Sequence, residues 1–537
     1  MARLLPLLAF LPLPLVLVRA GYEGAMPGSL MGEGWGRLFV AGQLARWVRG
    51  EAPWGVADLC FGAEPLPFWP VDLVPTAVLA ATRPLGDAGA MAATIAVLFA
   101  LAGAGTFAAA RALGATTAGA IAAGLGLQAH PFLLRNAEDD ILEVLAVGFV
   151  PLGIAALARA LRAPSAGNLV LLGLAAWALG ASNPYAALHA AIAGVVASPF
   201  LLKRHGARTF GATVAAMALG MGLAAAPVVA TERRAGGRLG GAYTAGFTLA
   251  PGERVRLAPP GPRVAGEAPG EGGRAPRERP EPERKAPPPW ATLPGGTAAI
   301  VGTAAALFSR RARPFAVVAV LAWLAGPAPG QLARMLHLGP GFRFDLVQTV
   351  VGALPLSLGN PQRGILIFAV AAWLAVARLG GWGLALAGLA IAEAATSLPD
   401  LRIPGAVISV DRDVLAAVRG PAITFPNGDP PVFHPGVPPK WGLYLASLHE
   451  EPVASDYARG GAPADLGFVA ELSAVAGVPV SARLRDAPPS DTAGFASVLV
   501  LYSLLPPPVQ ARARDWLAAE LGEPAVETEW GAVWRLD

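Results

Sequence analysis

Residues 88–110, AGAMAATIAVLFALAGAGTFAAA, form an uninterrupted apolar stretch that decides the fold of this chain. A helix needs about 20 apolar residues to cross roughly 30 Å of hydrocarbon, and this stretch is long enough. Comparable stretches recur near residues 113–130, 141–158, 167–184, 186–202, 209–230, 294–309, 314–329, 364–378 and 381–398. Together with a first helix in residues 1–20, they predict a mainly α-helical, polytopic transmembrane bundle of about 11 spans.

The composition agrees with a membrane-embedded chain. The mean hydropathy is +0.51 and only 15% of the residues are charged, against about 25% in an average soluble protein. The net charge of +4 comes mainly from arginine, and so small a surplus does not indicate nucleic-acid binding. A single cysteine, Cys60, excludes an intramolecular disulfide and a cysteine-based zinc site.

Basic connectors give the expected orientation, because loops rich in Lys and Arg stay in the cytoplasm. The strongest are RALRAPS at 159–165, LKRHGAR at 202–208 and SRRARP at 309–314. Residues 66–83, which contain three prolines before residue 76 and Asp72, are interpreted as a short, broken or re-entrant segment on the outer face. Residues 138–140 then lie outside a bacterial cytoplasmic membrane; with 66–83 as a full span, they would lie inside the cell.

The N-terminal end and the first hydrophilic region carry two further predictions. Residues 1–20 fit either a signal peptide or an uncleaved first helix, and the prolines and Arg19 favour the helix. In the outer loop 21–66, the residues Leu38, Gln43, Leu44 and Trp47 predict an amphipathic helix lying at the membrane interface.

The rest of the chain divides at two composition changes. Residues 231–293 are too rich in Pro, Gly and charge to fold and predict a disordered loop. The tail alternates short β-like runs with a helical stretch, which predicts an extramembrane α/β domain. The expected parts are an N-terminal transmembrane module at 1–230, the loop at 231–293, C-terminal transmembrane helices at 294–399 and an extracytoplasmic domain at 400–537.

Acidic residues next to the apolar stretches are the first candidates for chemistry. Glu138, Asp139 and Asp140 lie between two stretches in the phrase RNAEDD, and Glu33 lies in the first outer loop. Carboxylates beside hydrocarbon are costly and indicate a function, although Glu33 also fits a solvated surface group and the acidic run also fits a helix start. On one membrane face, the two loops would supply a proton acceptor and ligands for a divalent cation or a cationic acceptor.

Four phrases support a family resemblance. They are GEAPWGVADLCFGAEPLPFWP at 50–70, GPAITFPNGDP at 420–430, WGLYLASLHEEPVASDYARGG at 441–461 and LGEPAVETEWGAVWRLD at 521–537. With a first helix, a long outer loop, many spans and a soluble tail in that order, the chain resembles the GT-C superfamily of membrane glycosyltransferases, including its YfhO-like members. The resemblance covers the whole chain in layout, and its motifs are short and degenerate.

The resemblance implies an inverting glycosyltransferase that takes a sugar from a polyprenyl-phosphate donor and uses an acidic residue of the first outer loop. By position, that catalytic role falls to Glu33, and the second-loop acidic site falls to Asp139, with Glu138 and Asp140 as substrate-binding neighbours. Glu33 is flanked as GEG and lacks the paired acidic residues of the family pattern.

Further substrate contacts are expected at the outer surface. The leaving phosphate needs cations, and Arg343 in the loop RMLHLGPGFRFDLVQ is the candidate; snorkelling beside Asp345 is the structural alternative. Asn183 and Tyr185, in SNPYAAL at an expected outer helix end, would contact a sugar or form an interfacial turn.

A non-enzymatic protein is the second hypothesis, namely a transporter, flippase or assembly factor for surface polysaccharide or lipid. No P-loop, dinucleotide fingerprint, metal-ligand spacing or nucleophile elbow occurs with its required context. A polar path through the bilayer would favour transport, whereas an outward-facing acidic cavity would favour the enzyme. The expected partners are the lipid bilayer and the lipid-linked donor.

Overall fold

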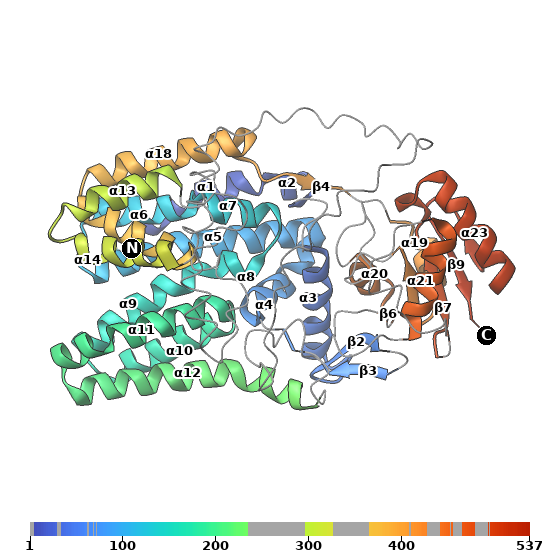
Figure 1. The fold of residues 1–537 in the computed structure, drawn as a ribbon, viewed down its shortest axis with the longest axis horizontal. Helices are drawn as coiled ribbons and strands as arrows, with labels where there is room; N and C mark the ends of the chain where they lie inside the picture. The colour runs from blue at the N-terminus through green and yellow to red at the C-terminus, as the bar shows by residue number, and fades with distance from the viewer. Residues whose placement is uncertain are drawn as a thin grey trace, which may run out of the picture.

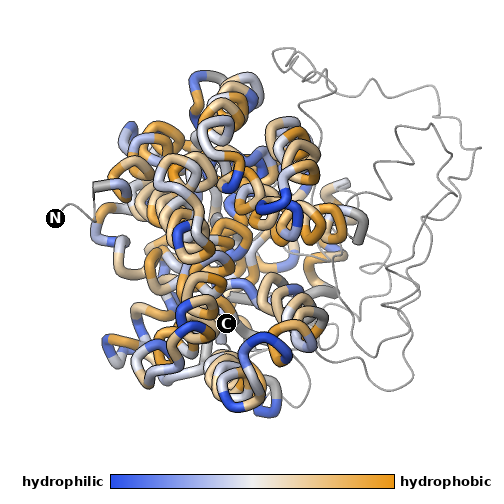
Figure 2. Tube along the Cα trace, turned by 90° about the vertical axis from the view of Figure 1, so that its left-hand side faces the viewer, coloured by the Kyte–Doolittle hydropathy of each residue, from blue (hydrophilic) through white to orange (hydrophobic). Residues whose placement is uncertain are grey.

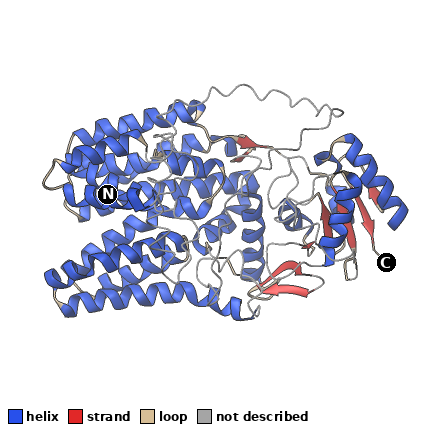
Figure 3. Cartoon of the chain, in the orientation of Figure 1, coloured by secondary structure: helices blue, strands red, loops and turns tan. Residues whose placement is uncertain are grey.

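The molecule has two parts that differ in secondary structure. A body of long helices lies on one side and a domain of helices and strands lies on the other (Figure 1, Figure 3). Apolar residues predominate along the helices of the body (Figure 2). The computed structural model describes residues 5–28, 34–61, 64–67, 69–70, 72–234, 296–325, 365–407, 410–426, 441–451, 453–454, 464–477, 492 and 494–536.

A helix forms within each apolar stretch that the sequence predicts. Many of the buried residues that form the core of the body come from α5, which follows the short helix α4. The helices of the body are η1 (Leu5–Phe10), α1 (Pro12–Leu17), α2 (Arg19–Tyr22), α4 (Leu73–Thr82), η2 (Arg83–Leu85), α5 (Gly86–Ala112), α6 (Thr117–Gln128), α7 (Pro131–Glu138), α8 (Leu142–Leu145), η3 (Ala146–Gly148), α9 (Phe149–Arg162), α10 (Ala166–Gly180), α11 (Pro184–His205), α12 (Ala207–Arg234), α13 (Thr297–Leu307), α14 (Arg313–Ala325), α17 (Ile365–Val376), η5 (Ala377–Leu379) and α18 (Trp382–Ser397).

The lengths of the helices do not fix the number of membrane spans, although the helices lie where the sequence predicts them. Three helical runs among the described residues are long and apolar enough to cross a membrane, namely Leu73–Ala112, Leu142–Arg162 and Ala207–Thr231. The pair Ala186–Val195 and Ala197–His205, bent by 58°, adds a fourth if it is one span. The other apolar helices have 10–17 residues, so helix length does not establish the expected 11 spans.

Small residues allow the helices of the body to approach closely. A Cβ built on Gly220 of α12 would lie 2.1 Å from the carbonyl oxygen of Gly173 of α10, and one on Gly148 would lie 2.6 Å from the backbone nitrogen of Ala102. No side chain fits at such distances. Because lipid tails are as apolar as leucine, helices in a membrane associate through this kind of close packing, which explains the many Ala and Gly residues.

A carboxylate within an apolar helix has a structural explanation. Glu393 of α18 is buried, and its carboxylate accepts hydrogen bonds from the backbone nitrogens of Thr297 at 2.8 Å and Ala298 at 3.2 Å. These nitrogens belong to the first turn of α13, where backbone donors lack partners within the helix. Glu393 therefore joins α18 to the start of α13.

The second domain contains strands from both ends of the chain. Its seven-stranded sheet has the order β3-β2-β6-β5-β7-β9-β8, with parallel pairing from β2 to β7 and antiparallel pairing in the remaining pairs. The domain expected over 400–537 thus also includes a hairpin formed by residues of the first loop. The strands are β2 (Val56–Phe61), β3 (Glu64–Pro67), β5 (Ala422–Phe425), β6 (Val453–Ala454), β7 (Ser497–Val500), β8 (Val526–Glu527) and β9 (Ala532–Arg535).

A second strand pair joins the end of the first helices to the start of the tail. Strand β1 (Met26–Pro27) pairs antiparallel with β4 (Gly405–Ala406), and the guanidinium of Arg402 lies 2.5 Å from the carboxylate of Glu23. The remaining helices lie on both sides of β4 in the sequence, and α21 and α23 pack against each other beside a core of sheet residues. They are η6 (Pro399–Leu401), α19 (Arg412–Ala417), α20 (Trp441–His449), α21 (Ala464–Ala476), η7 (Tyr502–Leu504) and α23 (Pro507–Leu521).

Helix α3 (Gly34–Arg49) lies between the two parts and runs across the ends of the body helices (Figure 1). The expected helix of the outer loop is present, but its residues Leu38, Gln43, Leu44 and Trp47 are buried. They were expected at the membrane interface, and this was wrong because α3 packs against α4 on one side and α20 of the second domain on the other. The helix is therefore internal to the protein.

Aromatic and polar contacts hold α20 against the start of α3. The rings of Trp35 and Tyr444 meet edge to face with 5.0 Å between centroids, and the hydroxyl of Tyr444 donates to the carboxylate of Asp87 at 3.1 Å. Asp87 also lies 3.4 Å from the guanidinium of Arg83. The second domain thus contacts both the first outer loop and the start of α5.

Burial of His449, at the end of α20, predicts a pH-dependent stability. Loss of solvation lowers the pKa of its imidazole from 6.5 to about 4. The unfolded chain gains a proton below its pKa and the folded chain does not, so stability is full at neutral pH and falls as the pH drops through this window. We expect a loss of up to about 3 kcal/mol near pH 4, measured by thermal denaturation in detergent. His449→Asn should reduce this slope, and equal slopes would contradict the assignment.

Candidate functional site

The acidic run lies where α7 ends and the chain turns toward α8. Glu138 is the last residue of α7 and Asp139 follows as its C-cap, and both are half-buried. Asp140 comes next in the left-handed conformation, with φ of 54°, and its side chain is fully buried. The run therefore lies between the C-terminus of α7 and the start of the helical run Leu142–Arg162, so the helix-start interpretation of these acidic residues stands beside the functional one.

The turn at Asp140 has the hydrogen bonds of a Schellman motif. The backbone nitrogen of Asp140 donates to the carbonyl of Ala137 at 3.4 Å, and that of Ile141 donates to the carbonyl of Asn136 at 2.9 Å. Glycine is the usual residue at this position, because a Cβ is disfavoured in the left-handed conformation. Aspartate adopts it at a conformational cost, and such outliers cluster at functional sites.

The carboxylate of Asp140 lies against the first outer loop. A Cβ built on Gly28 would lie 2.0 Å from its Oδ2 atom, and one built on Gly34 would lie 2.7 Å from the same atom. Both positions admit only glycine while this carboxylate is there. Gly34 begins α3, and the positive end of a helix dipole stabilises a nearby carboxylate. Two segments about 100 residues apart in sequence are thus packed together, and Glu33 is the residue immediately before Gly34.

The other candidate residues are placed only in part. Glu33 and Arg343 lie outside the described residues, and so does the side chain of Tyr185, although its backbone belongs to α11. Asn183 is fully buried and caps α11, with its Oδ1 accepting from the backbone nitrogen of Ala186 at 2.8 Å. Its contact with a sugar stays a prediction, as do the roles of the other candidates.

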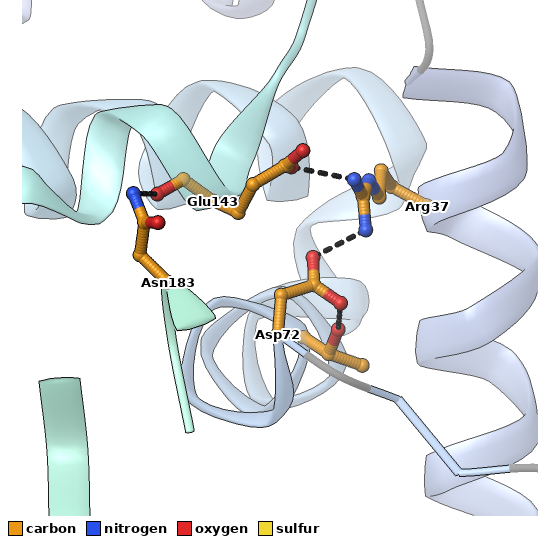
Figure 4. A network of polar contacts seen from close by, with 5 residues as sticks. Arg37, Asp72, Glu143 and Asn183 are labelled. Atoms are coloured by element: carbon orange, nitrogen blue, oxygen red, sulfur yellow. Dashed lines mark hydrogen bonds and ion pairs between the residues drawn. The ribbon is translucent and has the colours of Figure 1, made fainter. Parts of the chain in front are cut away.

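A buried ion-pair network connects α3 to both neighbouring segments. The guanidinium of Arg37, on the first turn of α3, contacts the carboxylate of Asp72 and lies 2.5 Å from the carboxylate of Glu143 (Figure 4). Each of the three residues is at least nine-tenths buried. Asp72 precedes α4, and Glu143 belongs to α8, which follows the acidic run. One arginine thus ties the first loop to α4 and to the second loop.

Further hydrogen bonds hold Glu143 and Asp72, the two residues that contact Arg37. The amide nitrogen of Asn183 donates to the backbone carbonyl of Glu143 at 2.6 Å, and the hydroxyl of Thr76 lies 3.4 Å from the second oxygen of Asp72. In Figure 4 the guanidinium of Arg37 lies between the two carboxylates, and Asn183 approaches Glu143 from the far side. Asn183 therefore joins α11 to the same assembly that positions the start of α3.

Sequence reasoning missed Arg37 and Glu143 and treated Asp72 only as a helix breaker. A signal was available, because each is a charged residue next to strongly apolar neighbours, where charges are rare unless paired. The sequence does not indicate which of these charged residues pair with one another. Among the described residues, no group of three or more His, Cys, Asp or Glu side chains is arranged to hold a metal ion.

Comparison with known proteins gives a likeness in fold. No protein-family model matches the sequence, and no curated protein matches it. The cryo-EM structure of the arabinofuranosyltransferase AftD from mycobacteria, a GT-C glycosyltransferase, matches with a TM-score of 0.54 and 17% identity. The match covers 98% of this chain and 41% of the AftD chain, so this chain spans less than half the length of that protein.

At 17% sequence identity, the match to AftD shows a similarity of fold alone. It supports the expected GT-C architecture, and it does not extend to the YfhO-like members named above. This chain is therefore mainly helical, with helices long and apolar enough to cross a membrane, a small sheet domain and a fold similar to that of the mycobacterial arabinofuranosyltransferase.

Proposed function

We propose that this protein is a membrane glycosyltransferase that moves a sugar from a polyprenyl-phosphate donor to an extracytoplasmic acceptor with inversion. The observation that carries the proposal is the packing of Asp140 against Gly34. It brings the acidic run of the second loop next to the segment that contains Glu33. The fold likeness to an arabinofuranosyltransferase supports the same reaction class.

The proposed reaction needs one proton acceptor on the outer face. A carboxylate, Glu33 in our assignment, takes the proton from the acceptor hydroxyl as its oxygen attacks the anomeric carbon. The bond from this carbon to the phosphate oxygen breaks on the opposite side, and the lipid phosphate leaves with the bonding electrons. A single displacement of this kind inverts the anomeric configuration. Asp139, half-buried at the end of α7, is assigned to align the hydroxyl.

The remaining proposed contacts concern the two ends of the donor. Arg343 is assigned to the leaving phosphate, because a guanidinium binds phosphate oxygens in a bidentate manner. Glu138 and Tyr185 are assigned to the sugar side of the site, and Asp140, which is buried against Gly28 and Gly34, is assigned to position the first loop. The C-terminal domain would then lie outside the cytoplasmic membrane, on the side of the first loop.

Sugar transfer by purified protein tests this assignment. With a radiolabelled polyprenyl-phosphate donor, Glu33→Gln and Asp139→Asn should each lower turnover by about a hundredfold to ten-thousandfold, the range for loss of general acid–base catalysis. The matched control is Glu529→Gln, which alters an exposed carboxylate of the second domain and should leave turnover unchanged. Equal turnover in all four proteins would remove the site assignment, and wild-type protein that only translocates the lipid-linked sugar would replace the enzyme with a flippase.

A further inference from the structure

Three tryptophans from separate segments form a cluster at the C-terminal end of α3. The rings of Trp47 and Trp69 are stacked at 19° with 6.1 Å between centroids. Trp54 lies 5.8 Å from Trp47 and 6.4 Å from Trp69, also between centroids. Trp47 is fully buried, whereas Trp54 is 56% exposed. The cluster therefore has a buried base and one open aromatic face.

The first-loop hairpin brings the cluster together. Val56 of β2 pairs with Pro67 of β3 in an antiparallel register. Trp54 lies two residues before β2 and Trp69 lies two residues after β3, so the antiparallel pairing of these strands brings the two residues near each other. The hairpin belongs to the sheet of the second domain, so the cluster is built on the extramembrane side of the molecule and not within the helical body.

An exposed ion pair lies between Trp47 and Trp54 in the sequence. The guanidinium of Arg49 donates to both carboxylate oxygens of Glu51, at 2.5 Å and 2.6 Å, and both side chains are about half exposed. A sugar ring presents C–H groups on one face and hydroxyls at its rim. The C–H groups pack against the electron-rich face of an aromatic ring, while a planar ion pair offers both donors and acceptors to the hydroxyls. The combination suits a neutral, polyhydroxylated ligand.

From these contacts we propose that Trp54, Trp69 and the Arg49–Glu51 pair form a saccharide-binding subsite for the acceptor. The identification of the saccharide as the acceptor rests on the function proposed above. The binding of a saccharide at this position does not. Trp47 lies 13 residues after Gly34 on α3, which corresponds to about 20 Å along a helix. An acceptor that reaches from the subsite to the acidic run is therefore a chain of several sugar units.

The competing explanation is an anchor in the membrane interface, where tryptophan is common. The two explanations predict different ligands for Trp54, namely an oligosaccharide for the subsite and lipid for the anchor. A subsite binds oligosaccharide in detergent without any bilayer, whereas an anchor changes only in contact with lipid.

Binding of linear arabino-oligosaccharides of one to six units to purified protein tests the subsite, with manno-oligosaccharides for comparison. We expect Trp54→Ala to weaken binding of the longest chain by about tenfold, equivalent to roughly 1.4 kcal/mol, and to leave monosaccharide binding unchanged. Trp54→Phe should retain most of the affinity. The matched control is Trp382→Ala, an exposed tryptophan at the start of α18, which should bind like the wild type.

The outcomes separate the subsite from the proposed function. Binding is measured in the Glu33→Gln background, so lost turnover cannot be mistaken for lost binding. Length-dependent binding that disappears in Trp54→Ala supports the subsite even if no transfer activity is found. Equal affinity in Trp54→Ala and wild type overturns it, as does an absence of oligosaccharide binding together with fluorescence quenching by brominated lipids that is smaller in Trp54→Phe than in the wild type.

Discussion

Replacing Arg37 with methionine is expected to lower the free energy of unfolding by about 3–5 kcal/mol, the range for breaking a buried ion pair by removing one partner. Arg37 contacts Asp72 and Glu143, and the change leaves both carboxylates buried without the guanidinium. Each charge lost its hydration when the protein folded, and the arginine compensates for that loss. The measurement is thermal or denaturant unfolding in detergent micelles.

The matched control for this change is Arg49→Met. Arg49 also makes a short ion pair, with Glu51, but both partners are exposed, and such pairs contribute between about 0 and 1 kcal/mol. Adding Asp72→Asn and Glu143→Gln to Arg37→Met should recover part of the stability, because neutral amides lose less on burial than carboxylates. Equal losses in Arg37→Met and Arg49→Met would show that the buried network does not stabilise the fold.

The helices of the body could be predicted because their signal is local. A stretch such as residues 88–110 must be continuously apolar to remain in lipid, and α5 forms there. The span count could not be predicted in the same way. Residues 73–82 form a short helix that continues into α5 as one run of 40 residues, and the path of such a run depends on its neighbours.

The candidate site depends on contacts that no local pattern encodes. Arg37 and Glu143 are 106 residues apart in sequence, and α3 is held across the helix ends by α20, which follows some 400 residues later. The presence of acidic residues in two loops could be predicted, because it follows from the composition of the loops and their positions between apolar stretches. The sequence could not indicate which acidic side chain meets the other loop, because that depends on one turn, at Asp140.

Asp140 should separate catalysis from stability, because its backbone conformation and its carboxylate can be changed independently. Asp140→Asn keeps the shape and tolerates the left-handed conformation, and Asp140→Gly removes the strain of a Cβ there. Because the amide keeps the size of the carboxylate and relief of backbone strain contributes up to about 1 kcal/mol in Asp140→Gly, we expect both variants to keep the stability of the wild type. Sugar transfer should fall by about a hundredfold, since misplacing a catalytic segment by about 1 Å has that effect.

The matched control is Asp400→Gly, because Asp400 has a similar φ of 56° but an exposed side chain at the start of the tail. It should gain a comparable backbone stabilisation and keep full turnover. The informative comparison is between unfolding temperature and turnover in the same preparations. If the Asp140 variants lose both together, the carboxylate serves only to hold α3 in place; if they keep both, the acidic run has no part in the reaction. Only lost turnover with retained stability fits a carboxylate that positions the reacting loop.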